Sequence, residues 1–147
     1  KRFNCWWLDY PVWIASRDFV LDEREAVPLL AHPEGSPFRK RMLESLRQVD
    51  RQSQIVYQSP ALRGLINAAV AGMGVTALPL SAVHDDEAMK SGQIRVLDPK
   101  KDGLPVLESV QYGIYSRRLE GETVQAGQSA FTECLVELID SFGSEKL

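Results

Sequence analysis

Two serine–proline pairs are the best candidates for chemistry in this chain, because each one starts a predicted helix after an extended run. Ser36-Pro37 follows the apolar run 27–31, and Ser59-Pro60 follows Ile55-Val56-Tyr57. The first turn of a helix leaves backbone N–H groups unpaired and carries about half a positive charge. Two such turns at one sheet edge would converge on an anion, and Arg39 could add a bidentate guanidinium. The alternative interpretation is that both serines only cap their helices.

The other patterns that could perform chemistry do not fit their sequence context. The run 72–77, GMGVTA, has the spacing of a dinucleotide-binding loop. Its glycines, however, end a predicted helix and open a strand, whereas that loop requires the opposite order. They are better explained as a tight turn back into the sheet.

The run 84–87, HDDE, cannot direct four adjacent side chains at one metal ion and is better explained as a solvated helix start. His32 and His84 are the only histidines, and G-x-S-x-G is absent. We therefore expect no catalytic residue, no metal and no cofactor.

The serine pairs lie in a chain that alternates between extended and helical patterns. Apolar residues at helical spacing predict one helix from Ser36 to Val49 and a second from Ser59-Pro60 to Gly72. A short helix is predicted in 81–90, a loop in 98–105 and a long amphipathic helix from Val124 to Phe142. Extended runs are predicted at 12–15, 27–31, 55–57, 75–78, 94–97 and 109–116. Strands joined by helices must be parallel with right-handed crossovers, so the pattern predicts an α/β fold with a parallel sheet flanked by helices.

The overall composition is that of a globular protein, and it excludes several functional classes. Charged residues make up 25% and apolar residues 44% of the 147 positions. A formal charge of −3 argues against a broad nucleic-acid-binding surface. No run has the length of a membrane span, and no signal peptide is present at the start. Cys5 and Cys134 are too few for a disulfide framework, which favours the cytoplasm. Because the chain begins at Lys1 within a structured pattern, we expect a fragment of a longer protein.

Three sequence blocks resemble the effector-binding domain of LysR-type transcriptional regulators. The blocks are 33–39 (PEGSPFR), 55–62 (IVYQSPAL) and 69–79 (AVAGMGVTALP). Their order and spacing fit the family, and 11–15 resembles the strand that precedes them. The resemblance covers most of residues 6–140, and the core A-G-x-G-V-x-x-L-P of the last block is its most specific part. Trp13 and Leu29-Leu30 resemble the LrhA/PecT-like subgroup.

The resemblance implies a periplasmic-binding-protein-like fold of type 2, in which two Rossmann-like α/β subdomains enclose a small-molecule effector. Residues 1–10 would end the first subdomain and form a hinge strand, 11–108 would form the complete second subdomain, and 109–147 would be the returning strand and helix of a partial first subdomain. The hinge crossings would lie at Tyr10, Pro11, Glu108 and Ser109. The ligand-binding residues implied by the family are Ser36, Pro37, Phe38, Arg39, Ser59 and Leu62.

The resemblance also implies partners. The family's winged helix-turn-helix and the first half of its first subdomain have no counterpart in these residues, so we expect DNA binding only through that missing N-terminal domain, and no membrane partner. Residues 109–147 would then lack sheet neighbours. Their apolar side chains would be exposed, which predicts a homodimer or a higher oligomer. These side chains are Val110, Tyr112, Phe131 and Leu135.

Three functions are compatible with these expectations, and one of them fits best. The leading interpretation is an effector-sensing domain that binds a small anionic inducer and controls DNA binding by the regulator. The alternative is a solute-binding protein of a transporter, which uses the same fold but normally carries an export signal. An enzyme on this fold is disfavoured by the shortage of paired acid–base residues.

Overall fold

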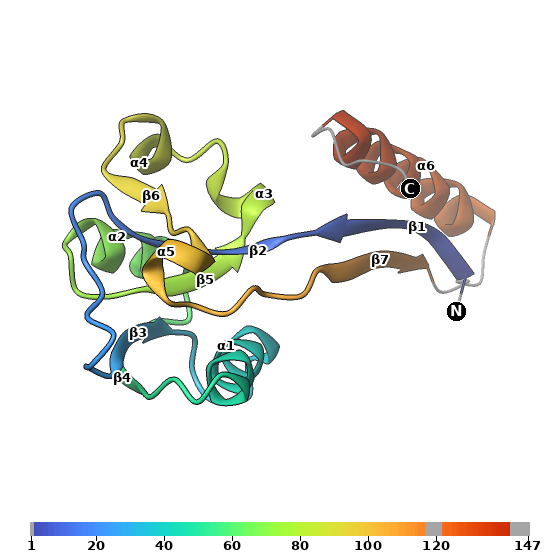
Figure 1. Ribbon diagram of the computed structural model, residues 1–147. Coiled ribbons are helices and arrows are strands. Elements are labelled where there is room, and N and C mark those ends of the chain that lie inside the picture. The colour runs from blue at the N-terminus through green and yellow to red at the C-terminus, as the bar shows by residue number, and fades with distance from the viewer. Residues whose placement is uncertain (1, 117–121, 142–147) are drawn as a thin grey trace. The chain divides into compact units, whose positions relative to one another are not determined.

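The computed structural model describes residues 2–116 and 122–141 of the chain (Figure 1). These residues form two compact units. The larger unit is Tyr10–Glu108, and the smaller one consists of the described parts of the segments on either side of it.

The larger unit is built on five strands in two hydrogen-bonded groups, which a single parallel bridge joins side by side. β5 (Thr76–Pro79), β2 (Pro11–Ser16) and β6 (Ile94–Val96) form one group, and β3 (Val27–Ala31) pairs in parallel with β4 (Ser53–Gln58). A parallel bridge between Leu29 and Val75 joins the two groups, with Leu30 N–H donating to the Val75 carbonyl at 2.9 Å. The strand order is therefore β4-β3-β5-β2-β6.

The expectation of a purely parallel sheet was wrong at one strand. β2 runs antiparallel to both of its neighbours, β5 and β6. The right-handed crossover rule constrains only strands that are joined through a helix. β2 is joined to β3 by the irregular segment 17–26, so that rule does not fix its direction.

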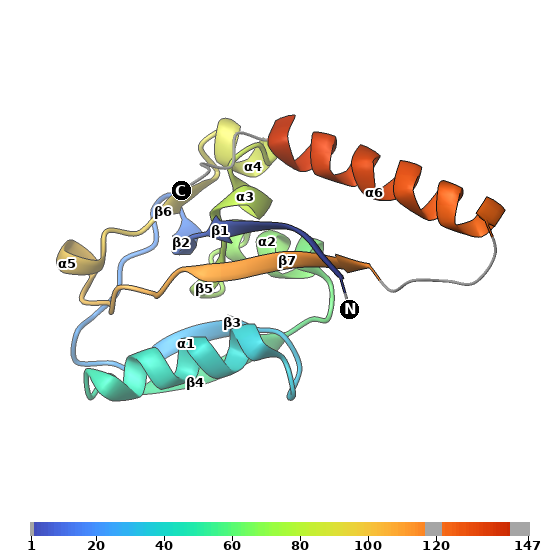
Figure 2. The ribbon, with the colours of Figure 1, turned by 90° about the vertical axis from the view of Figure 1, so that its right-hand side faces the viewer.

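Helices cover both faces of this sheet, as Figure 2 shows for α1 (Pro37–Gln48) beside β3 and β4. Neighbouring strand residues point to opposite faces, so Trp13 and Ala15 pack with Met42 and Leu46 of α1 in one core. The other core contains Ile14 and Leu30 from the strands, and its helical residues come from three helices. These are α2 (Leu62–Val70), α3 (Leu80–Val83) and α4 (Glu87–Lys90).

The predicted helices differ from the observed ones mainly at short elements. The helix predicted from Ser36 is α1, which has Pro37 at its first position. The single helix predicted in 81–90 is two short helices, α3 and α4, with a turn between them. The loop predicted in 98–105 contains one helical turn, α5 (Pro99–Asp102). Asp98 starts that turn because its carboxylate accepts the Lys100 N–H at 2.9 Å.

The smaller unit consists of β1 (Arg2–Asp9), β7 (Val110–Ser116) and α6 (Glu122–Ser141). β1 and β7 pair antiparallel, and the rings of Trp7 and Tyr112 stack with centroids 5.3 Å apart. The expectation that β7 would lack a sheet neighbour was therefore wrong, because β1 supplies one. Phe131 on α6 is 65% exposed, whereas Val110, Tyr112 and Leu135 are half-buried. Self-association remains a prediction.

Candidate functional site

The loops that lead into α1 and α2 begin at the same edge of the sheet. β3 and β4 are parallel neighbours, so both end on this side, and Ala31 pairs with Gln58 at their ends. Ser59, the next residue, donates its N–H to the Ala31 carbonyl at 3.1 Å. The segments that contain Ser36 and Ser59 thus both continue from this edge, which is where open α/β sheets bind ligands.

Arg39 links the two strand ends at this edge. Its Nη1 donates to Gln58 Oε1 at 2.6 Å and to the His32 carbonyl at 3.3 Å. Its Nη2 lies 3.7 Å from the carboxylate of Glu34, which is almost fully exposed, so this ion pair contributes little. The Arg39 side chain is only 15% exposed. A guanidinium has five N–H donors, so these contacts leave further donors for a ligand.

Neither predicted serine caps a helix through its side chain. Ser36 occupies the position before α1, but its hydroxyl makes no capping hydrogen bond. The expected start of the second helix at Ser59-Pro60 was wrong: α2 begins at Leu62, and Ala61 precedes it. Ser59 is buried, and its Oγ accepts the Ala61 N–H at 3.2 Å, which stabilises a local turn. The interpretation of both serines as simple caps is therefore not supported.

Gly64 provides the space that Ser59 occupies. A Cβ atom at Gly64 would lie 2.8 Å from the Cβ of Ser59 and 3.5 Å from the Tyr57 hydroxyl. The first turn of α2 therefore packs directly on the residue that follows β4. Leu62 lies at the start of this turn and is 36% exposed, while Phe38 on α1 is half-buried with its ring 6.1 Å from that of His32.

The paired glycines that resembled a dinucleotide loop form a tight turn back into the sheet, as expected. Gly72 has a φ of +75°, which a residue with a side chain rarely adopts. Gly74 is buried against Pro28, and a Cβ there would lie 3.1 Å from the Pro28 carbonyl carbon. The chain therefore turns at Gly72 and enters the bridge with β3 directly after Gly74.

The run 84–87 is only partly a solvated helix start. His84 and Asp85 are exposed, but the side chain of Asp86 is 6% exposed and forms an ion pair with Arg63. The hydrogen bond from Arg63 lowers the pKa of Asp86, which also caps α4 by accepting the Ala88 N–H at 2.9 Å.

Among the described residues, no group of three or more His, Cys, Asp or Glu side chains is placed to hold a metal ion. Across the same residues, no helix is long and apolar enough to cross a membrane.

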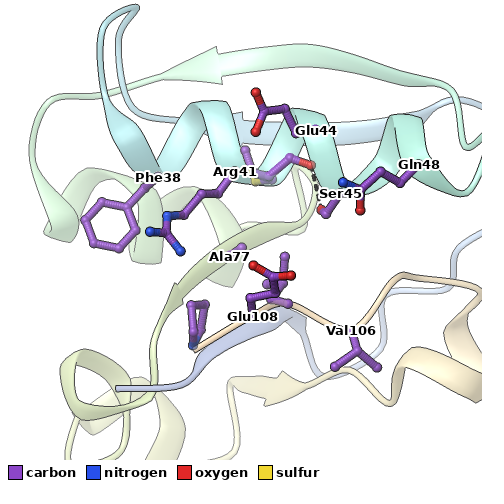
Figure 3. Close-up of a pocket in the computed structure, with 11 residues that line it drawn as sticks. Phe38, Arg41, Glu44, Ser45, Gln48, Ala77, Val106 and Glu108 are labelled. Carbon is purple, nitrogen blue, oxygen red and sulfur yellow. Dashed lines mark hydrogen bonds between the residues drawn. The ribbon is translucent and has the colours of Figure 1, made fainter. Parts of the chain in front are cut away.

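A groove that the sequence did not predict lies between α1 and the extended segment 104–108 (Figure 3). Of the predicted residues, Phe38, Pro11 and Glu108 line it, whereas Ser36, Arg39, Ser59 and Leu62 do not. The segment is fixed by Trp13, whose Nε1 donates to the buried Pro105 carbonyl at 2.8 Å. No sequence pattern could have located this groove, because its two walls are far apart along the chain.

Comparisons with known proteins agree on one family. A family model described as "LysR substrate binding domain" matches residues 4–138. The HTH-type transcriptional regulator PecT of Dickeya dadantii is 31% identical over 101 residues, which cover 69% of this chain and 29% of PecT.

Solved structures of similar fold belong to regulators of the same kind. The bromide-bound regulatory domain of HypT from Salmonella typhimurium matches with a TM-score of 0.67 at 17% identity, over 91% of this chain and 63% of that one. The CcmR regulatory domain of Synechocystis, solved with 2-PG, matches with a TM-score of 0.60 at 14% identity, over 90% and 66%. The chain thus spans under a third of PecT and under two thirds of the HypT domain.

Proposed function

This chain belongs to the LysR substrate-binding domain family, and we propose that it is the effector-sensing part of a LysR-type transcriptional regulator. The family consists of regulator domains rather than enzymes. The HypT and CcmR domains share the mixed α/β, periplasmic-binding-protein-like architecture of this chain. The similarity to PecT favours a regulator over the solute-binding protein of a transporter.

The observation that carries the proposal is the shared edge of β3 and β4, where Arg39 links the two helix-starting loops. We place the effector there, in contact with Ser36, Pro37, Phe38, Arg39, Ser59 and Leu62. The α1 amides have no side-chain cap and Arg39 carries a full charge, so a small anion is the ligand that this edge suits best. The bromide in the HypT domain and the 2-PG in the CcmR domain show that relatives of this fold bind small molecules.

The boundaries of the two units support a two-subdomain mechanism. The larger unit begins at Tyr10 and ends at Glu108, so we place hinge crossings at Tyr10-Pro11 and Glu108-Ser109. In this scheme the larger unit is the second subdomain, and the smaller unit belongs to the first. An effector that binds one placement of the subdomains more tightly shifts the population toward it. A homodimer in the cytoplasm would pass this change to a winged helix-turn-helix outside the present residues.

The test compares Arg39→Ala with Arg47→Ala in the complete effector domain. Arg47 lies on the same helix but is exposed near its other end. The ligand is one that induces the intact regulator in a reporter assay, and calorimetry measures its affinity. Loss of a charge-assisted hydrogen bond, worth about 1.5–3 kcal/mol, predicts roughly 10- to 100-fold weaker binding for Arg39→Ala and no change for Arg47→Ala. Equal affinities for both variants would show that Arg39 does not bind the effector.

A further inference from the structure

The groove beside α1 is lined by two side chains of opposite charge, Arg41 and Glu108. Arg41 extends into it from α1, and Glu108 extends into it from the opposite wall (Figure 3). Among the described residues, neither side chain has a hydrogen-bond or ion-pair partner, and the two are too far apart to pair with each other. Glu44 also lines the groove, but it pairs with Lys40 at 3.8 Å and points away from the opposite wall. One cation and one anion are therefore left to face a ligand.

The floor between these charges is apolar and small. Met42 and Ala77 are buried, with exposed fractions of 3% and 8%, and they lie between the two charged walls. The hollow measures about 100 Å³, less than the cavity of about 150 Å³ that accommodates benzene. A ligand of this size would have a few non-hydrogen atoms. It would place an anionic end on Arg41, a cationic end on Glu108 and a short apolar body on the floor.

Both walls of the groove are anchored by buried contacts, so the backbone that carries the two exposed charges is held in place. Met42 and Leu46 anchor α1 in the core. The bond from Trp13 Nε1 to the Pro105 carbonyl and the buried Leu104 hold the segment that leads to Glu108. A ligand therefore has to order only the two charged side chains and not the walls that carry them.

We propose that this groove is a second ligand site, which binds a small zwitterion carrying a carboxylate and an ammonium group, as free amino acids do. The carboxylate binds Arg41 and the ammonium binds Glu108. This site adjoins the proposed effector edge at Phe38, which lines the groove, but Arg39 and Ser59 do not line it. Pro11 and Glu108 lie at the two ends of the larger unit, so the ligand contacts both segments by which the chain enters and leaves that unit. Its binding would stabilise those segments against α1.

The test titrates the isotope-labelled protein with L-alanine, propionate and ethylamine, and follows the backbone amide signals of 41–48 and 106–108 by NMR. Propionate keeps only the carboxylate of alanine, and ethylamine keeps only the ammonium. We expect alanine to bind at least 10-fold more tightly than either probe. We expect Arg41→Gln and Glu108→Gln each to weaken alanine binding at least 10-fold, a difference of about 1.4 kcal/mol. Arg47→Gln, an equivalent change on the same helix outside the groove, should leave it unchanged.

Arg39→Gln separates this proposal from the effector site. If alanine binding survives Arg39→Gln and is lost in the groove variants, the groove is the zwitterion site. If Arg39→Gln loses alanine binding and both groove variants keep it, alanine binds at the effector edge. That result would overturn the groove proposal but not the proposed effector site. Equal binding of the singly charged probes, or no saturable shift up to about 10 mM alanine, would also overturn it.

Discussion

Replacing Gly74 by alanine is the sharpest test of how the two strand groups are joined. A Cβ at this buried position would lie 3.1 Å from the Pro28 carbonyl carbon and closer still to its oxygen. That oxygen accepts the Val75 N–H at 2.8 Å, and Leu30 donates to the Val75 carbonyl at 2.9 Å. The new methyl group must push β3 and β5 apart at the bridge that joins the two strand groups.

The expected loss follows from these contacts. Overpacking costs about 1–3 kcal/mol, and weakening two hydrogen bonds adds about 1 kcal/mol each, for a total of roughly 3–5 kcal/mol. Gly92→Ala is the control, because Gly92 has a φ of +75° with no atom near its would-be Cβ, so only about 1–2 kcal/mol of backbone strain is expected. Urea unfolding followed by circular dichroism measures the free energy of unfolding of both variants. A Gly74 variant no less stable than the Gly92 variant would refute this explanation of the bridge.

Three further changes test the framework around the site. Trp13→Phe leaves a buried carbonyl without its donor and removes ring area, and should lower the free energy of unfolding by about 2–4 kcal/mol in urea titrations. Gly64→Ala should destabilise the protein although alanine favours helices, because Ser59 must move; a rise in the thermal midpoint would contradict this. Arg63 lowers the pKa of Asp86, so the stabilisation is present above about pH 4 and is lost as the pH falls further. The stability difference between wild type and Asp86→Asn should therefore shrink below that pH, and a constant difference would argue against the ion pair.

The parts of the fold that the sequence predicted are those with strong local signals. The helical spacing of apolar residues located α1, and Pro37 marked its start. The strands around Leu29 and Ile55 were recognisable as short apolar runs bounded by polar residues. Gly72 and Gly74 were correctly interpreted as a turn into the sheet, because their order relative to helix and strand excluded a nucleotide loop.

The parts that the sequence did not predict depend on contacts between distant residues. The direction of β2 is set by its pairing with β5 and β6, not by its own residues. The turn at Ser59 delays α2 to Leu62, although Ser59-Pro60 is a typical helix start. One wall of the groove is held by a hydrogen bond from Trp13 to a carbonyl 92 positions away. The contact of Arg39 with Gln58 had no signal in the sequence, and its contact with an effector stays a prediction.

We propose that an anionic effector binds where the loops after β3 and β4 meet. The most direct measurement is a crystal structure of the complete effector domain, purified with the ligand that it retains from cells. We expect density for a small anion in contact with Arg39 and the backbone near Ser36 and Ser59. A retained ligand bound elsewhere, with the guanidinium of Arg39 still directed only at Gln58 and His32, would contradict it.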